Sequence, residues 1–256
     1  MLFDDLKHKV VLVTGSSAGI GKATAILFAK NGCKVVVTGR NQQRLNEVAL
    51  KCEEVSLFKY KCVKFAGDLS EDETLKALIE KTIAEYGKLD ILVNNAGDGK
   101  YSCILDDDFI EGYELLMRVN TRAPLLLSRM ALPYLIESKG CIINVSSVSA
   151  IRVIPSIMAY SMSKAALDMM TKHLAAEFGP KGVRVNSVNP GYVKTLLHQR
   201  SNLPESIYDE LSKNQPISRP GESEEIANAI CFLASSKSAY TTGACFVIDG
   251  GSCLVA

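Results

Sequence analysis

Long apolar runs are missing from this sequence of 256 residues. The most apolar stretch, residues 123–136, is interrupted by Arg129 and is too short to span a hydrocarbon core, so we expect a buried helix there. The first nine residues include Asp4, Asp5 and Lys7, and they have too few apolar side chains for the core of a signal peptide. We therefore expect no membrane span, no export signal and a cytoplasmic protein.

A strong charge of either sign is missing as well. The chain has 29 basic and 28 acidic residues, and no basic run is long enough to follow a phosphate backbone, so we expect no nucleic-acid partner. Apolar residues make up 47% and charged residues 22%, which excludes a disordered chain and a coiled coil. No repeat or linker divides the sequence, which predicts a single domain over residues 1–256.

Cysteine and histidine are too sparse for a disulfide framework or a zinc site. No two of the eight cysteines lie two to four residues apart, as zinc ligands usually do. The three histidines, His8, His173 and His198, are not paired at helical spacing. We expect reduced, mostly buried thiols and no metal.

Short apolar runs alternate with longer segments of helical periodicity. Runs rich in Val and Ile without polar alternation are typical of strands buried on both faces. This alternation predicts a doubly wound α/β fold, with a parallel sheet of about seven strands and helices on both faces. The expected strands are residues 10–13, 35–37, 63–66, 91–93, 142–145, 183–188 and 246–248, and the expected helices include 20–30, 71–86, 113–136, 157–178 and 223–233.

A glycine-rich turn follows the first expected strand. It reads Thr14-Gly15-Ser16-Ser17-Ala18-Gly19-Ile20-Gly21 and leads directly into the first expected helix. Residues without a Cβ let backbone amides approach a pyrophosphate at the positive end of a helix. The spacing G-x-x-x-G-x-G is not the commonest dinucleotide pattern, and a structural tight turn explains the glycines alone equally well. Its place after the first strand favours a dinucleotide site, where Ser16 and Ser17 add hydroxyl donors.

The end of the second strand bears on the choice of dinucleotide. A carboxylate there would accept hydrogen bonds from both ribose hydroxyls and repel a 2′-phosphate. Here Gly39 takes that place, and Arg40 follows with a guanidinium suited to a phosphate. This favours NADP over NAD. The alternatives are an Arg40 that only begins a solvated loop, and a cofactor choice weakened by Ala18, which adds no second cation.

A phenol and an amine stand four residues apart at Tyr160 and Lys164, on one face of an expected helix. A neighbouring cation lowers a tyrosine pKa from about 10, so we expect proton exchange with a substrate oxygen near neutrality. The same spacing at Tyr60 and Lys64 leads into an expected strand, where the two groups are about 13 Å apart. Ser147, at the end of the fifth expected strand, is placed to donate to the same oxygen, although it is also explained as a loop serine or a helix cap.

Together these residues resemble the short-chain dehydrogenase/reductase family in its single-domain form of about 250 residues, which has a Rossmann-type fold. The resemblance covers nearly the whole chain. Besides the glycine turn, Ser147, Tyr160 and Lys164, it rests on Asp68, Asn94-Asn95-Ala96-Gly97, Asn120, Asn189-Pro190-Gly191 and Asp249-Gly250-Gly251.

The resemblance implies hydride transfer between a nicotinamide and a carbonyl or secondary alcohol. It makes Tyr160 the acid and base, and it implies that Lys164 lowers the pKa of Tyr160 and binds the nicotinamide ribose. It further implies that Ser147 orients the carbonyl and that Asn120 holds a water that relays protons. Cofactor contacts are implied for Asp68 and Leu69 at the adenine, for the Asn94 backbone, and for Val193 and Thr195 at the carboxamide. An enzyme using NADPH is expected to run as a reductase.

The substrate pocket is expected between residues 98–102, 148–156 and 192–216. The last segment carries the apolar residues of an expected lid, and the alternative for them is ordinary core packing. An apolar wall favours a lipophilic ketone or an acyl chain, and Lys194, His198 and Arg200 are basic residues near the lid. The expected lid residues are Leu196, Leu197, Leu203, Ile207, Tyr208 and Leu211, and the expected wall residues are Ile151, Val153, Ile154 and Pro155.

Two other functions stay open at this point, an NAD-dependent alcohol dehydrogenase and a cofactor-binding sensor or scaffold without turnover. The intact Ser147, Tyr160 and Lys164 argue against the second. The family resemblance also implies a homotetramer formed through the two long helices, residues 113–136 and 157–178, and through the C-terminal strand. The apolar tail Cys253-Leu254-Val255-Ala256 fits burial against another subunit.

Overall fold

Seven parallel strands form one sheet in a computed structural model that describes residues 3–196, 204 and 206–255. The sheet has the order β3-β2-β1-β4-β5-β6-β7, so the direction of winding reverses between β1 and β4. Ligands of such sheets bind in the crevice at this point, beyond the carboxyl ends of the strands. The strands are β1 Val10–Val13, β2 Lys34–Gly39, β3 Val63–Ala66, β4 Ile91–Asn94, β5 Cys141–Val145, β6 Arg184–Pro190 and β7 Cys245–Ile248.

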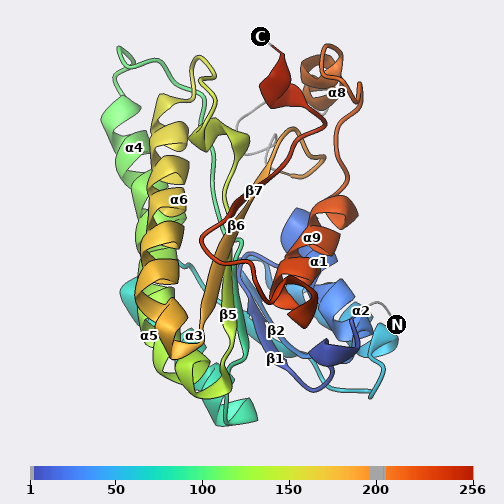
Figure 1. The fold of residues 1–256 in the computed structure, drawn as a ribbon. Coiled ribbons are helices and arrows are strands. Elements are labelled where there is room, and N and C mark those ends of the chain that lie inside the picture. The colour runs from blue at the N-terminus through green and yellow to red at the C-terminus, as the bar shows by residue number, and fades with distance from the viewer. Residues whose placement is uncertain (1–2, 197–203, 205, 256) are drawn as a thin grey trace.

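Helices cover both faces of the sheet (Figure 1). On one face α1, α2 and α9 pack together, and on the other α3, α4, α5 and α6 do. Each face has its own apolar core, because the central strands β1, β4 and β5 are buried on both sides. The helices are α1 Gly19–Lys30, α2 Gln42–Val55, α3 Asp72–Tyr86, α4 Phe109–Met117, α5 Ala123–Ser138, α6 Met158–Phe178, α8 Ile207–Ser212 and α9 Ser223–Ala234.

The predicted doubly wound parallel sheet is confirmed, with local differences among the helices, one of which is that the short helix α8 was not expected. The helix expected over residues 113–136 is longer and is interrupted, since a π-helical turn at Arg118–Arg122 joins α4 to α5. Helix α2 was not predicted, although Asn41 caps it by accepting a hydrogen bond from the Arg44 N–H (2.9 Å). Its mostly polar composition hides a narrow buried stripe that includes Leu45, Val48 and Cys52.

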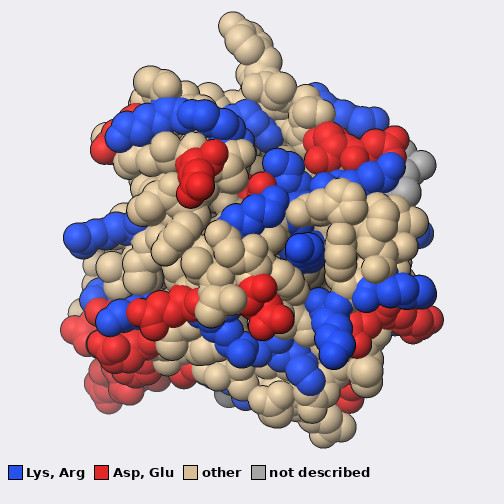
Figure 2. Space-filling view, turned by 90° about the horizontal axis from the view of Figure 1, so that it is seen from below, with Lys and Arg blue, Asp and Glu red and all other residues tan. Residues whose placement is uncertain are grey.

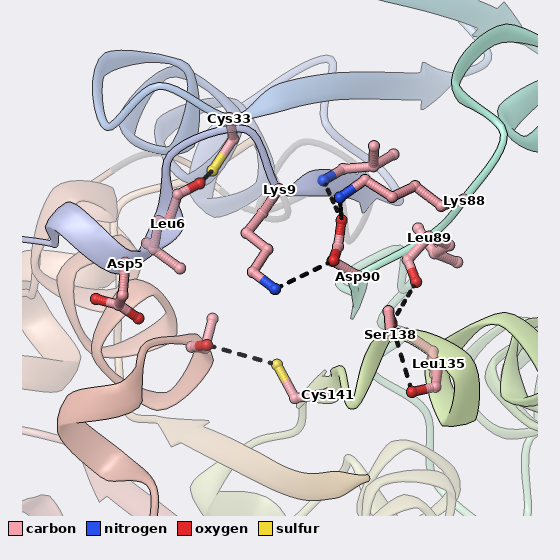
Figure 3. A network of polar contacts seen from close by, with 12 residues as sticks. Asp5, Leu6, Lys9, Cys33, Lys88, Leu89, Asp90, Leu135, Ser138 and Cys141 are labelled. Carbon is pink, nitrogen blue, oxygen red and sulfur yellow. Dashed lines mark hydrogen bonds and ion pairs between the residues drawn. The ribbon is translucent and has the colours of Figure 1, made fainter. Parts of the chain in front are cut away.

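The amino ends of the strands are held together by a buried carboxylate, that of Asp90 (Figure 3). It accepts the backbone N–H of Val10 at 2.8 Å and forms ion pairs with Lys9 at 3.2 Å and Lys88 at 2.8 Å. The carboxylate thereby joins the start of β1 to the start of β4, at the edge of the sheet away from the crevice. Basic and acidic side chains are intermixed over the face seen from below in Figure 2.

No helix within the described residues is long and apolar enough to cross a membrane.

Candidate active site

A cleft of about 350 Å³ opens at the carboxyl ends of the strands, where the winding reverses. This volume lies in the range of small-molecule sites. The cleft runs from the glycine turn and the end of β2, past the loops after β4 and β5, to α6 and α8. The expected site residues that line it are Gly15, Ser17, Gly19, Ile20, Arg40, Asp68, Leu69, Ser147, Tyr160, Lys164, Val193 and Thr195.

The glycine turn is shaped so that its backbone faces the cleft. Gly15 has a φ of +61°, and a Cβ on it would lie 2.7 Å from the Cα of Ala96. A Cβ on Gly21 would lie 2.5 Å from the carbonyl oxygen of Gly15, so only glycine lets α1 pack this closely on the turn. No side chain caps the first turn of α1, and no acidic residue lies in it. The turn therefore presents a helix N-terminus suited to a phosphate.

Two expected cofactor residues of this region, Ser16 and Asn94, do not line the cleft, and neither does Gly21. The Ser16 hydroxyl is fully buried and donates to the carbonyl oxygen of Val13 (2.8 Å). The Asn94 amide points into the core, where it donates to Asn144 Oδ1 (2.9 Å). These side chains thus brace the strands, while Gly21 allows the close packing of α1.

Of the neighbouring residues Asn94 and Asn95, it is Asn95 that lines the cleft, although the sequence analysis assigned no role to it. Its side-chain Nδ2 donates to the carbonyl oxygens of Thr14 (2.8 Å) and Gly15 (3.2 Å). The asparagine therefore fixes the glycine turn to the end of β4. Strand alternation was a usable signal, because two neighbouring residues at the end of a strand point in opposite directions.

The end of the cleft where the sequence predicts the adenosine carries charge of both signs. The Arg40 guanidinium lies 3.9 Å from a carboxylate oxygen of Asp68 and 3.9 Å from one of Asp98. The pKa of Asp68 is lowered, first because the Ser70 N–H donates to it and to a smaller extent by Arg40. A Cβ on Gly39 would lie 2.9 Å from Ser17 Oγ, so a side chain at this position requires the Ser17 hydroxyl to rotate away.

At the other end of the cleft, Tyr160 and Lys164 lie one turn apart on α6. The Lys164 amine is 5.7 Å from the centre of the Tyr160 ring, and both residues line the cleft, so the predicted common face is confirmed. The second tyrosine and lysine at this spacing, Tyr60 and Lys64, do not form such a pair. Tyr60 contacts His8 Nδ1 through its hydroxyl (2.6 Å), whereas the Lys64 amine donates to Asn46 (2.9 Å).

The predicted lowering of the Tyr160 pKa is wrong for this structure. Desolvation in the cleft raises the pKa of Tyr160 to about 12, and a hydrogen bond with Ser147 only partly opposes this. Burial also lowers the pKa of Lys164 to about 8, against the opposing charge of Asp168. The Lys164 amine donates to the carbonyl oxygen of Val145 (2.9 Å). At neutral pH, Tyr160 is therefore a protonated phenol, which is the form that a proton donor requires.

Ser147 stands beside Tyr160, directly beyond β5. Its hydroxyl oxygen accepts the N–H of Ser149 (3.2 Å) as the cap of a short 3₁₀ turn, so the cap and cleft interpretations of this serine hold together.

Asn120 lies in the π-helical turn and is fully buried behind the cleft. Its Oδ1 accepts the Asp98 N–H (2.8 Å), and its Nδ2 donates to the Asp98 carbonyl oxygen (2.9 Å) and to Ser163 Oγ (3.0 Å). A Cβ on Gly97 would lie 3.2 Å from Asn120 Oδ1 and 3.3 Å from the Lys164 amine. Asn120 thus ties the loop after β4 to α6, close to Lys164. π-Helical turns occur often at functional sites.

The substrate end of the cleft is lined by tyrosines and aliphatic residues. Tyr101, Tyr192 and Tyr208 all line the cleft. Of these three, the sequence analysis named only Tyr208, as a residue of the expected lid. Of the expected wall only Ile154 lines the cleft, whereas Ile151 is 60% and Val153 is 92% exposed, and Pro155 also lies outside the lining. Leu196, Ile207, Tyr208 and Leu211 of the expected lid line the cleft, whereas Leu197, His198, Arg200 and Leu203 lie outside the described residues.

Among the described residues, no group of three or more histidine, cysteine, aspartate or glutamate side chains is arranged to hold a metal ion.

Known proteins are similar to this one along almost the whole chain. A family model described as enoyl-(acyl carrier protein) reductase matches residues 15–253. Glucose 1-dehydrogenase of Gluconobacter oxydans is 39% identical over 97% of this chain and 93% of the relative. The 3-oxoacyl-(acyl-carrier-protein) reductase FabG of Thermotoga maritima is 35% identical over 96% of this chain and 98% of the relative.

A solved structure extends the likeness to the fold. L-Sorbose reductase of Gluconobacter frateurii, complexed with NADPH and L-sorbose, matches with a TM-score of 0.90 at 31% identity, over 99% of both chains. With its glycine turn, its cleft and the pair on α6, the chain belongs to the short-chain dehydrogenase/reductase family and is an oxidoreductase.

Proposed function

We propose that the protein is an NADPH-dependent reductase that converts a ketone of a lipophilic or acyl-type substrate to a secondary alcohol, reversibly. The observation that carries this proposal is the meeting of Tyr160, Lys164 and Ser147 in the same cleft as the glycine turn. The reaction needs a proton donor beside a hydride donor, and this cleft offers a protonated phenol at one end and a phosphate-binding turn at the other.

The residues present fit a dinucleotide. The turn at Gly15 and Gly19 would hold the pyrophosphate, since side chains there would fill the space that its backbone faces. Asp68 and Leu69 would lie at the adenine, Lys164 at the nicotinamide ribose, and Val193 and Thr195 at the carboxamide, and the backbone of Asn94 remains a predicted contact. When bound, the cofactor supplies the hydride.

Arg40 supports NADP over NAD. Its ion pairs with Asp68 and Asp98 are long, and the guanidinium itself is exposed; such pairs contribute at most about 1 kcal/mol each. A 2′-phosphate carries more charge and accepts a guanidinium through two hydrogen bonds, so it would displace these carboxylates. The same two carboxylates favour the second candidate, an NAD-dependent alcohol dehydrogenase, because they partly neutralise Arg40.

In the proposed reaction Tyr160 donates its phenolic proton to the ketone oxygen as that oxygen gains negative charge. Ser147 donates a hydrogen bond to the same oxygen and thereby orients the carbonyl. The Lys164 cation stabilises the phenolate that is left on Tyr160, and the predicted role of Asn120 is to hold a water through which the proton is replaced. In the reverse direction the phenolate is the base.

The substrate class rests on the lining of the far end of the cleft. Ile154, Ile207 and Leu211 offer apolar contact, and the rings of Tyr101 and Tyr208 add flat surface with hydroxyl groups. The relatives named for glucose and sorbose point to a sugar as the alternative, which would use those hydroxyls as hydrogen-bond partners.

The test is a panel of cyclic ketones, 3-oxoacyl thioesters and ketoses, followed by loss of NADPH or NADH absorbance. We expect ketone reduction with NADPH to be at least tenfold more efficient in kcat/KM than with NADH. The variant Arg40→Ala should remove this preference. The matched control is Arg44→Ala, which changes an exposed arginine in the first turn of α2 that does not line the cleft. A preference for NADPH that survives Arg40→Ala would refute the cofactor assignment, and turnover of ketoses alone would refute the lipophilic class.

The predicted homotetramer also remains a proposal. Exposed apolar side chains support subunit contacts. They include Ile110 on α4, Met162 and Met169 on α6, Phe246 on β7 and Leu254 in the C-terminal tail. Light scattering of the purified protein measures the assembly. All eight cysteines are free, which supports the proposed cytoplasmic location because the cytosol keeps thiols reduced.

A further inference from the structure

We propose that Asp168 is a positioning residue for the reaction, which anchors Ser147 through the side chain of Asn189 and faces Lys164 from the next turn of α6. This inference rests on the proposed reductase function for its kinetic consequences. It concerns residues that the sequence analysis gave no role in the chemistry, because Asp168 was not singled out and Asn189 entered only as part of a family motif.

The carboxylate of Asp168 is built into the core between α6 and β6. Asp168 is 5% exposed, and its two oxygens have different partners. Oδ1 accepts a hydrogen bond from the Ser187 hydroxyl at 3.0 Å, and Oδ2 accepts one from Asn189 Nδ2 at 2.6 Å. Burying a carboxylate is strongly unfavourable unless hydrogen bonds replace its water. The hydrogen bonds from Ser187 and Asn189 to this buried carboxylate therefore indicate a role other than packing.

Asn189 connects this carboxylate to the active site. Its amide nitrogen has two hydrogens, of which one goes to Asp168 and the other to the carbonyl oxygen of Ser147 (3.1 Å). The paired register of β5 and β6 ends at Val145 and Val188, so Ser147 lies beyond it. The Asn189 amide therefore fixes the backbone at Ser147 where the sheet has stopped doing so. Because the amide is planar, Asp168 sets the direction of the second hydrogen.

The same carboxylate faces the amine that supports Tyr160. Tyr160, Lys164 and Asp168 recur every four residues on one face of α6. The negative charge of Asp168 raises the pKa of Lys164 and so opposes the larger effect of burial. Asp168 thus acts on two groups of the site at once, on the Ser147 backbone through hydrogen bonds and on the Lys164 cation through its charge.

The two effects are separated by two variants. Asp168→Asn keeps the shape and an oxygen for Asn189 but removes the charge, so the pKa of Lys164 should fall further. We expect kcat for ketone reduction to drop at least tenfold, and the decline of kcat at high pH to begin about one pH unit lower. Asn189→Ala keeps the charge and cuts the link to Ser147. It should lower kcat at least tenfold with the pH of that decline unchanged.

Thr171→Val is the matched control. Thr171 is a buried polar residue on the same helix that does not line the cleft. It joins α6 to β5 by accepting a hydrogen bond from Asn144 (2.8 Å), and its hydroxyl donates to the carbonyl oxygen of Leu167 (2.9 Å). We expect this variant to lose stability but to keep kcat within threefold of the parent and to keep its pH profile. Parental kcat and a parental pH profile in folded Asp168→Asn would overturn the proposal, as would a kcat in Asn189→Ala equal to that of Thr171→Val.

A readout without turnover keeps the proposal distinct from the proposed function. The rise of unfolding free energy with pH that Lys164 causes should begin at lower pH in Asp168→Asn than in the parent, measured by urea denaturation from pH 6 to 10.5. If the protein reduces no ketone and this window still moves, the proposed function fails while the influence of Asp168 on Lys164 stands. An unmoved window contradicts that influence.

Discussion

Replacing Lys164 by methionine should make the protein more stable at neutral pH while removing its activity. Lys164 is 4% exposed, and burial lowers the pKa of its amine from 10.5 to about 8. One pKa unit corresponds to 1.36 kcal/mol, so keeping the buried amine protonated destabilises the fold by about 3 kcal/mol below pH 8. Methionine has a similar length and carries no charge.

One loss opposes this gain. The carbonyl oxygen of Val145 loses the hydrogen bond that it accepts from Lys164, which costs about 1–2 kcal/mol when the group stays buried. The attraction between Lys164 and Asp168 is already contained in the pKa of about 8. We therefore expect a net increase of about 1–2 kcal/mol in the free energy of unfolding at pH 7.

The pH dependence identifies the cause. The pKa of Lys164 is lower in the folded than in the unfolded protein, so the unfolded state binds more protons between pH 8 and 10.5. The parent protein should therefore gain about 3 kcal/mol across that window relative to Lys164→Met, and the order of stability should reverse. Urea denaturation of both proteins at pH 7 and at pH 10.5 measures this. A difference that does not change with pH, or a variant less stable at pH 7, would refute the argument.

Two further predictions address the cofactor end and the opposite edge of the sheet. Gly39→Asp should lower the ratio of kcat/KM for NADPH to that for NADH at least tenfold, because a carboxylate there repels a 2′-phosphate; Gly179→Asp, at an open position, is the control. Asp90→Asn should lower the free energy of unfolding by about 2 kcal/mol without changing kcat, because it weakens the pairs with Lys9 and Lys88 far from the cleft. Unchanged selectivity in the first variant, or impaired kcat in the second, would contradict these assignments.

The elements that the sequence predicts well are those whose signal is local. Continuous Val and Ile runs mark the buried strands, and the spacing of Tyr160 and Lys164 identifies one helical face. The contacts missed by the sequence analysis join distant segments. Asn95 reaches back to Thr14, and Asn189 bridges Ser147 and Asp168, so none of these pairs is visible before the sheet is assembled.

The direction in which the Tyr160 pKa shifts also depends on contacts between distant segments. The spacing of Tyr160 and Lys164 indicates that a cation is near, which alone predicts a lowered pKa. How much water the cleft excludes depends on side chains from α4, α6 and α8 together, and this desolvation decides the sign. Likewise Ile151 and Val153 are apolar in the sequence but exposed in the fold.

The central claim is that Tyr160 supplies the proton in the reaction, and Tyr160→Phe tests it most directly. The variant keeps the ring that packs beside Phe109 and Ala159 and removes only the hydroxyl. We predict that it binds NADPH within threefold of the parent Kd by fluorescence titration, while kcat for ketone reduction falls at least 100-fold. A variant that reduces the same ketone at the parental rate would contradict the account.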